Sequence, residues 1–330
     1  MSSRDFLHKD AETPLCEYYV AAGAICGLAT NSEDVLEAAR GTFEVLAAPP
    51  ASPDFSIRLW IDGSDQARPS WPKPYARGLD HLVFAGFDTG SSFLADLRSR
   101  RVLGRFSAGM AADTAYWKTI IFPMLLSIVA GSVGLVELHA SCVAADERGL
   151  ILIGPTGSGK STLALAFTQA GFGFLSDDRT FCSFQGKLLA WGMPRPLKLR
   201  REAACWFEEL RDREPSDIQN GERVFHCFPN RRFGTERIRA CEPQVLIFLE
   251  RQDKSDYRLS GISEEEARSR IELDLLPEFR DVVEEQSAVI ERLTALRCLR
   301  LTYGGRPQVI VEQLVGDLLA FTTDLPARQV

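Results

Sequence analysis

Gly154-Pro155-Thr156-Gly157-Ser158-Gly159-Lys160-Ser161 is the stretch that decides how the second half of this chain folds. It fits the pattern GxxxxGK[ST] at every fixed position. The apolar run 150–153 before it predicts a buried strand, and residues 161–167 after it carry apolar side chains at helical spacing. A strand, a glycine-rich loop and a helix in this order predict a loop that binds phosphate groups.

The residue types of this loop suit a nucleoside triphosphate with Mg²⁺. Glycines let the backbone curl around phosphate oxygens, and the N-terminus of the following helix attracts the anion. Lys160 is expected to reach the β- and γ-phosphates, and the Ser161 hydroxyl to bind Mg²⁺. We therefore predict ATP and Mg²⁺ as cofactors, although the sequence does not separate ATP from GTP. The expected nucleotide-binding residues are Gly154, Pro155, Thr156, Gly157, Ser158, Gly159, Lys160, Ser161 and Thr162.

Two acidic side chains follow the next apolar run of the sequence. Residues 173–176 predict a strand, and Asp177 and Asp178 come directly after it. Carboxylates at such a strand end suit both metal binding and proton abstraction from a hydroxyl. Neighbouring strand residues point to opposite faces, so the two need not have the same role. A polar turn after a strand is the other interpretation of this pair.

His139 precedes the loop within an apolar run that extends from Val136 to Val143. A strand over this run, adjacent to the strand before the loop, would bring His139 near the phosphates. A single histidine in an apolar run is more often a buried core residue, so the residue type alone does not decide.

The order of these motifs resembles the catalytic domain of HPr kinase/phosphorylase. That group has a histidine-glycine pair, a P-loop and paired aspartates at matching spacing, and it shares its P-loop fold with phosphoenolpyruvate carboxykinase. The chain is also similar to the broader set of HPr-kinase-like proteins, which includes kinases that act on lasso-peptide precursors. Three departures argue against HPr as the acceptor and against phosphorylase activity: Ala140 stands where the family has glycine, the family's Gly-Arg loop after the acidic strand has no counterpart, and the first 115 residues do not resemble the family's N-terminal domain. The matching segments are 138–141, 154–161, 170–172 and 176–178.

The resemblance implies roles for the matching residues. One of Asp177 and Asp178 would be the acid/base for a serine hydroxyl, the other a metal or substrate contact, and which is which stays open. We take Ser161 and Asp178 as the expected metal ligands, and His139 as a catalytic residue beside the γ-phosphate. The implied activity is phosphoryl transfer from ATP to a serine-type hydroxyl of a peptide or small protein. The alternatives are a small-molecule kinase and a nucleotide-dependent regulatory or binding module with little turnover.

A basic stretch beyond the acidic pair is a further candidate for phosphate contact. Residues 194–201 contain four cations, Arg195, Lys198, Arg200 and Arg201. A cation beside a transferring phosphoryl group stabilises its charge. The alternative interpretation is a solvated strand edge.

The rest of the pattern predicts two domains. Residues 1–115 read as a small α+β domain, available for substrate or partner binding, with a strand over 18–28, a helix capped by Ser32, a strand over 55–61 and a loop over 66–77. Residues 116–330 alternate strands and helices, which predicts an α/β domain. The resemblance implies that this domain is of the P-loop kinase type found in HPr kinase and phosphoenolpyruvate carboxykinase. Ser263 and Glu266 form a capping box for one of its helices.

Composition limits the remaining possibilities. The chain has 330 residues, a formal net charge of -7 and eight cysteines without a CxxC pair. We therefore expect a cytoplasmic protein with reduced thiols and without general attraction to nucleic acid or anionic membranes. The apolar run 120–136 is shorter than a span of about 20 residues, which favours a core helix. A homo-oligomer remains open.

Overall fold

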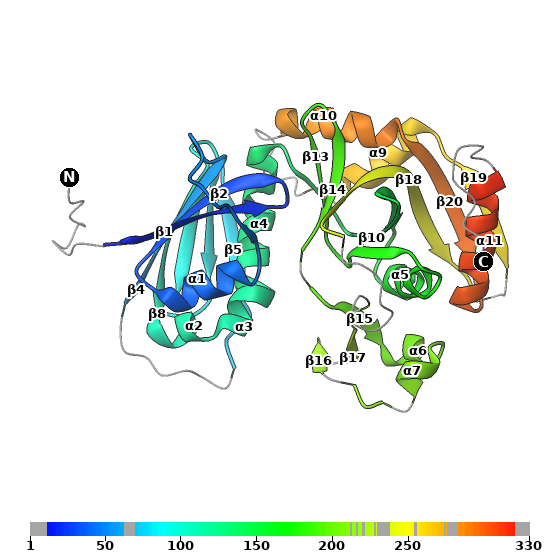
Figure 1. Ribbon diagram of the computed structural model, residues 1–330, viewed down its shortest axis with the longest axis horizontal. Helices are drawn as coiled ribbons and strands as arrows, with labels where there is room; N and C mark the ends of the chain where they lie inside the picture. The colour runs from blue at the N-terminus through cyan, green and yellow to red at the C-terminus, as the bar shows by residue number, and fades with distance from the viewer. Residues whose placement is uncertain are drawn as a thin grey trace. The chain divides into compact units, whose positions relative to one another are not determined.

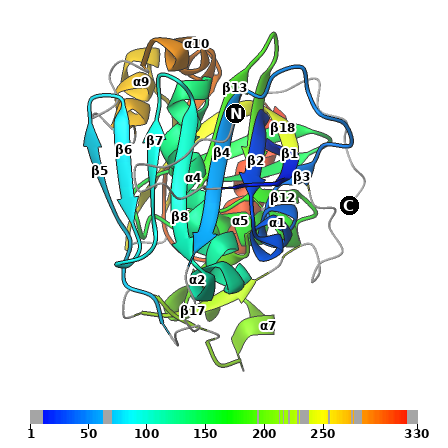
Figure 2. The same ribbon diagram turned by 90° about the vertical axis from the view of Figure 1, so that its left-hand side faces the viewer.

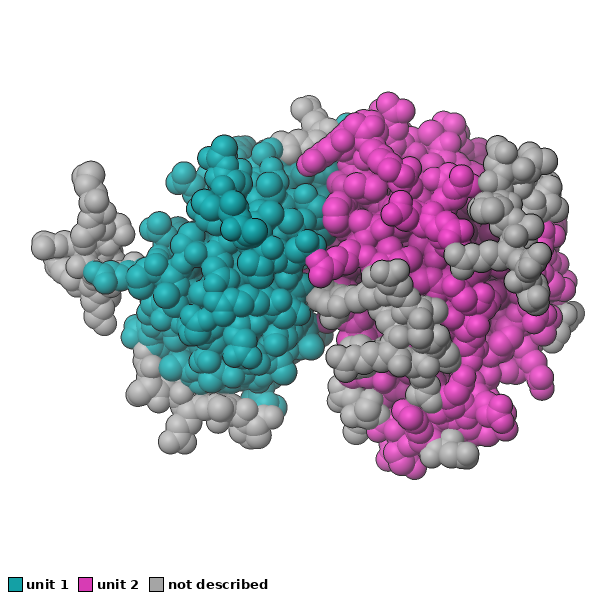
Figure 3. Space-filling model, viewed as in Figure 1, with its two compact units in different colours: residues 1–137, 275–289 teal, residues 138–274, 290–330 magenta. Residues whose placement is uncertain are grey.

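The computed structural model describes residues 12–62, 70–193, 195–211, 213–215, 217–219, 222–227, 229, 238–253, 256–273, 275 and 283–320. Its contacts divide the chain into two compact units, which Figure 3 shows in different colours. Unit 1 comprises residues 1–137 and 275–289, and unit 2 comprises residues 138–274 and 290–330. Both units combine helices with β-sheets, so the chain has a mixed α/β fold with several sheets.

Unit 1 is built on an eight-stranded sheet in the order β3-β1-β2-β4-β8-β7-β6-β5. Figure 2 shows β5 to β8 and β4 side by side. The pairings β2–β4 and β4–β8 are parallel, and the other pairings are antiparallel. Its strands are β1 (Leu15–Ala21), β2 (Ala24–Thr30), β3 (Glu44–Val45), β4 (Phe55–Asp62), β5 (Tyr75–Leu79), β6 (Leu82–Gly86), β7 (Ser92–Asp96) and β8 (Arg101–Ser107).

Aromatic side chains join this sheet to the helices of unit 1. The ring centroids of Phe106 on β8 and Trp117 lie 4.7 Å apart, and Phe43 lies 5.3 Å from Phe122. Ser32 caps α1 by accepting a hydrogen bond from Val35 N, as its position predicted. The helices are α1 (Glu33–Arg40), α2 (Ala108–Ala112), α3 (Thr114–Tyr116), the π-helical turn η1 (Trp117–Ile121), α4 (Phe122–Ala130) and the 3₁₀ turn η2 (Gly131–Val133).

Unit 2 has a mixed sheet whose centre is parallel. β11 and β20 both pair in parallel with the long strand β18, whereas β10 pairs antiparallel with β11 and β12. β19 pairs antiparallel with β20. The sheet runs β12-β10-β11-β18-β14-β13-β9. The strands are β9 (Val136–Leu138), which begins in unit 1, β10 (Ala140–Ala145), β11 (Arg148–Ile153), β12 (Gly173–Ser176), β13 (Thr180–Phe184), β14 (Leu188–Gly192), β18 (Ala240–Arg251), β19 (Tyr257–Gly261) and β20 (Arg297–Tyr303).

A separate three-stranded sheet and several helices complete unit 2 (Figure 1). The sheet has the order β15-β17-β16, with β15 (Leu197–Arg200), β16 (Asp217–Gln219) and β17 (Glu222–Cys227). The helices are α5 (Lys160–Gln169), α6 (Arg201–Ala204), α7 (Glu208–Arg211), α9 (Glu264–Glu272), α10 (Val283–Thr294), which begins in unit 1, and α11 (Pro307–Ala320).

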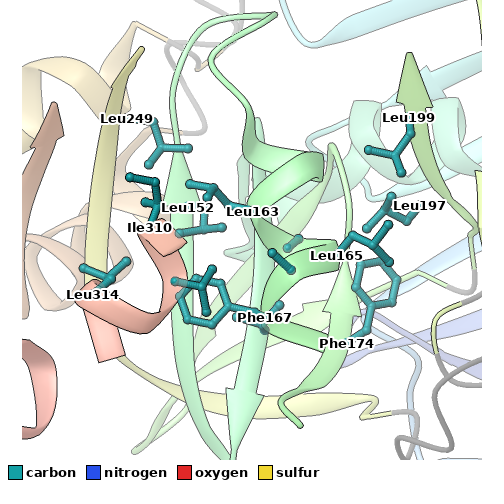
Figure 4. Packing of buried hydrophobic residues seen from close by; sticks show 14 of the residues in the cluster. Leu152, Leu163, Leu165, Phe167, Phe174, Leu197, Leu199, Leu249, Ile310 and Leu314 are labelled. Atoms are coloured by element: carbon teal, nitrogen blue, oxygen red, sulfur yellow. The ribbon is translucent and has the colours of Figure 1, made fainter. Parts of the chain in front are cut away.

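The helix that follows the glycine-rich loop is anchored in the core of unit 2. Leu163 and Phe167 of α5 are fully buried, and they belong to one apolar cluster with Leu152 of β11 and Leu314 of α11 (Figure 4). Fully burying side chains of this size stabilises the fold by about 1.5–3 kcal/mol each. The start of α5 is therefore held at a fixed place beside the strand end of β11.

Three expectations from the sequence differ from the structure. The strand predicted over 18–28 is a hairpin, because Ala22 and Gly23 have positive φ (52° and 90°) and reverse the chain. The strand predicted over 136–143 is interrupted at His139. Of the predicted loop 66–77, residues 75–77 belong to β5, and 66–69 lie outside the described residues.

The division by contacts falls at 137/138, not at the predicted 115/116. The helical segment after residue 115 packs on unit 1, because Trp117 contacts Phe106 of β8 and Phe122 contacts Phe43, which directly precedes β3. Residues 114–133 form a continuous helical run of 20 residues that is apolar enough to cross a membrane, so the length argument against a span fails. A buried core helix passes the same test, and Trp117, Ile121 and Phe122 are fully buried.

Candidate functional site

The glycine-rich loop has the strand, loop and helix that its sequence predicts. β11 ends at Ile153, and α5 begins at Lys160. A Cβ on Gly154 would lie 2.7 Å from Ser158 Oγ and 3.1 Å from the Leu249 carbonyl oxygen. Gly157 and Gly159 have φ of +86° and +93°, in the region that glycine adopts without strain. Each glycine of the motif is therefore required by the local backbone.

Tyr303, at the end of β20, contacts the glycine-rich loop at Ser158 and Gly159. Its hydroxyl donates a hydrogen bond of 2.6 Å to the Ser158 carbonyl oxygen, and it lies so close to Gly159 that a Cβ there would overlap it. Burial raises the pKa of this hydroxyl above its usual range. No local motif in the sequence marks Tyr303, because it lies more than 140 residues from its partner.

The loop concentrates hydrogen-bond donors at the N-terminus of α5. The Lys160 ammonium donates to the carbonyl oxygens of Gly154 and Pro155 at 2.6 and 3.2 Å, and the residue is buried. The buried Ser158 hydroxyl has no hydrogen-bond partner among the residues that the structure describes. The first N–H groups of a helix have no carbonyl partner within it, and they carry a partial positive charge. These groups fit the phosphates of a nucleotide.

Sheet register brings the other two motifs to the same place. Ala140, at the start of β10, lies opposite Ile153, where β11 enters the loop. Because β10 also runs antiparallel to β12, its start lies near the end of that strand, where Cys142 pairs with Ser176. His139 precedes β10, and Asp177 and Asp178 follow β12. The histidine, the acidic pair and the loop therefore meet at one edge of the sheet.

Asp177 is buried and tied to the first turn of α5. Its Oδ1 accepts hydrogen bonds of 2.7 Å from the hydroxyls of Ser161 and Ser141, and its Oδ2 accepts one of 3.0 Å from the Lys198 backbone N–H. Burial raises the pKa of this carboxyl, while the three hydrogen bonds oppose that shift. Ser141 and the backbone of Lys198 are contacts that the sequence did not single out, although Lys198 lies in the basic stretch.

Asp178 faces a different environment. Its Oδ1 lies 2.9 Å from His139 Nε2, and 55% of its side chain and 37% of that of His139 are exposed. The hydrogen bond from His139 lowers the pKa of Asp178 to about 2. Asp178 also has a φ of 69°, a left-handed conformation that is uncommon outside glycine. Adjacent carboxyls whose environments shift their pKa values in opposite directions are typical of sites with two distinct roles.

The aspartate that contacts Ser161 is Asp177. Ser161 was expected to share Mg²⁺ with Asp178, but the Ser161 hydroxyl contacts Asp177. Ser161 and Asp177 together offer a hydroxyl and a carboxylate oxygen at one point. Mg²⁺ is commonly held by one or two protein oxygens together with substrate phosphates, so this pair fits the ion.

No protein-family profile and no curated protein matches this sequence. Among solved structures, the HPr(Ser) kinase/phosphatase from Coxiella burnetii is similar at a TM-score of 0.30 and 14% sequence identity. The match covers 56% of this chain and 97% of that chain. A structural resemblance to a kinase/phosphatase therefore exists, but one this remote assigns neither a family nor an activity.

Proposed function

We propose that the chain transfers the terminal phosphoryl group of ATP to a serine-type hydroxyl of a peptide or small protein. The observation that carries the proposal is the meeting of Ser161–Asp177 and His139–Asp178 at the start of α5, directly beside the glycine-rich loop. When bound there, Mg²⁺ would neutralise phosphate charge and ATP would supply the phosphoryl group.

Residues 154–162 would bind the phosphates through backbone N–H groups, with the Lys160 ammonium among them. Ser161 and Asp177 would hold Mg²⁺, since a bound cation offsets the burial that raises the pKa of Asp177. The two hydrogen bonds from Ser141 and Lys198 keep this carboxylate in place. Positioning and charge neutralisation account for most of the rate in phosphoryl transfer.

Asp178 would accept the proton of the acceptor hydroxyl, and His139 would orient it. With a pKa of about 2, Asp178 is ionised at neutral pH and accepts a hydrogen bond from the hydroxyl from the outset. Full deprotonation is not needed early, because the transition state of phosphoryl transfer is loose. The exposure of Asp178 and His139 favours a large acceptor, such as a peptide, over a small molecule.

Mass spectrometry of a peptide mixture tests the proposal. The full chain is incubated with ATP, Mg²⁺ and a library of serine-containing peptides, with Lys160→Ala and Asp178→Asn as parallel reactions. We expect a subset of peptides to gain one phosphoryl group with the wild type only. ATP binding without any transferred phosphate, in peptides or in a small-metabolite mixture, would favour the regulatory module instead.

A further inference from the structure

The sheet of unit 1 has an apolar outer face. In β6, β7 and β8 the residues facing the helices are buried, among them Val83, Ala95 and Val102. The alternate residues point to the other face, where an antiparallel sheet usually carries polar side chains. Here Phe84, Leu94 and Leu103 occupy these positions, with 39%, 41% and 49% of their surface exposed.

Strand register aligns these side chains in one row. Phe84 pairs with Leu94, and Leu94 pairs with Leu103. The Tyr75 ring, on the neighbouring strand β5, lies 6.1 Å from the Phe84 ring and is also exposed. We call the outward-facing residues Arg58, Tyr75, Arg77, Phe84, Leu94 and Leu103 the Phe84 face. Contiguous exposed apolar side chains rimmed by polar ones are typical of interaction sites.

Arginines stand at both ends of the row. Arg58 pairs with Leu103 and Arg77 pairs with Phe84. Arg101 lies one row away on the same face. Among the described residues, neither Arg58 nor Arg101 forms a salt bridge. On this face Arg105 is paired with Asp62, and Arg101 lies opposite Asp96 in the strand register. The cations in line with the apolar row that have no ion pair among the described residues are therefore Arg58 and Arg77. A basic rim on a chain of net charge -7 is selective for an acidic partner.

We propose that the Phe84 face binds an extended acidic peptide that carries apolar side chains between its acidic residues. Adjacent strands lie about 4.8 Å apart, so Arg58 and Arg77, four strand spacings from each other, are separated by about 19 Å. An extended chain rises about 3.3 Å per residue, so two acidic residues about six positions apart reach both arginines. The apolar side chains between them cover Leu103, Leu94 and Phe84.

This surface goes beyond the phosphoryl-transfer proposal, because no residue of the Phe84 face belongs to the α5 site. It therefore binds its peptide without nucleotide. Burial of the row supplies affinity, and the two arginines supply orientation and discrimination against basic sequences. The attraction between exposed charges is screened, so binding weakens as salt rises.

Fluorescence anisotropy with a defined probe tests the surface. The probe is a labelled ten-residue peptide with glutamates at positions 2 and 8 and leucines at alternate positions between them, and a matched peptide has lysines in place of the glutamates. We expect the full chain to bind the glutamate peptide at least tenfold more tightly. Leu94→Ser, and the double variant Arg58→Glu/Arg77→Glu, should each weaken that binding at least tenfold.

Arg268→Glu is the matched charge reversal, on a half-buried arginine of α9 that pairs with Glu272, and it should leave binding unchanged. Lys160→Ala should also bind the peptide normally, which separates this proposal from the phosphoryl-transfer site. Equal binding of the lysine peptide, or unaltered binding by Leu94→Ser, overturns the inference. So does a dimer in sedimentation that Leu94→Ser dissociates, or binding to anionic lipid vesicles that competes with the peptide.

Discussion

The start of α5 and the Phe84 face depart from the usual pattern of burial in opposite directions, because the first buries polar side chains and the second exposes apolar ones. At α5 a carboxylate, an ammonium and hydroxyls are buried beside one another. On the Phe84 face, aromatic and leucine side chains are exposed where polar ones are expected. Buried polar groups cost free energy unless they are paired, and exposed apolar rows invite association. The two proposals would account for both costs, by an anion and a metal ion at the start of α5 and by a peptide on the Phe84 face.

The contrast predicts that the largest effect comes from the α5 site. Lys160→Ala should lower kcat/KM for phosphoryl transfer by about 10²–10³-fold, because it removes a charge from the developing transition state. Lys187→Ala, at an exposed lysine paired with Glu242, is the matched control and should stay within twofold of wild type. Steady-state kinetics with a phosphorylated peptide product measures both. A similar loss of kcat/KM in the two variants would show that Lys160 has no specific role in phosphoryl transfer.

Asp178 and His139 should differ in the size and type of their effect. Asp178→Asn removes the proton acceptor and should lower kcat by about 10²–10⁴-fold, with ATP affinity within twofold of wild type. His139→Ala should lower kcat only about tenfold, since His139 acts by positioning Asp178. His139→Gln, which can still donate a hydrogen bond, should recover part of that loss. Rapid-quench kinetics separates chemistry from binding, and an unchanged kcat in Asp178→Asn would refute the role.

Stability should respond to the close approach of Tyr303 to the loop. Gly159→Ala adds a methyl group against the Tyr303 hydroxyl at a positive φ, and should cost about 2–4 kcal/mol. Gly171→Ala has an equally positive φ of +94°, with nothing among the described residues within 4 Å of the added Cβ, and should cost only about 1 kcal/mol.

Adding Tyr303→Phe to Gly159→Ala should recover part of the difference, because the overlapping oxygen is removed. Urea unfolding of the three variants gives the free energies. Equal destabilisation by Gly159→Ala and Gly171→Ala would show that the positive φ alone accounts for the loss, and that the overlap with Tyr303 contributes nothing.

The smallest expected effect is a pH dependence at Asp178. Its pKa is lowered to about 2 in the folded state, below the usual value of about 3.9 in an unfolded chain. Its stabilising contribution is therefore complete above about pH 4 and is lost as the pH falls towards 2. The carboxyl is exposed, so the contribution is under about 1 kcal/mol. In urea unfolding between pH 6 and 3, the advantage of wild type over Asp178→Asn should shrink, and a constant difference would contradict the pairing.

The two regions also differ in how far the sequence could predict them. The loop and the acidic pair are short local signals that the sequence places at strand ends. His139 was expected within a strand beside the strand that precedes the loop, and it lies instead between β9 and β10. The contact of Ser161 with Asp177, and not with Asp178, could not be predicted, because the pair lies in a turn after β12 where strand alternation no longer applies. Tyr303 and Ser141 join the site through tertiary contacts without a local pattern.

The Phe84 face could not be predicted from the strands one at a time. The strands β6, β7 and β8 are short, and the row depends on the register between them. The hairpin turn at Ala22 and Gly23 was missed for a related reason, since the apolar run on both sides of it hid the reversal. Local sequence patterns therefore indicate where strands lie, whereas the pairing between strands determines the Phe84 face.

Isothermal titration of ATP into the wild type and Asp177→Asn, with and without Mg²⁺, tests the central claim most directly. The geometry at Ser161 and Asp177 predicts that Mg²⁺ tightens ATP binding to the wild type at least tenfold and has little effect in Asp177→Asn. ATP binding that ignores Mg²⁺ in the wild type, or that responds equally in both proteins, would contradict the assignment of this pair as the metal site.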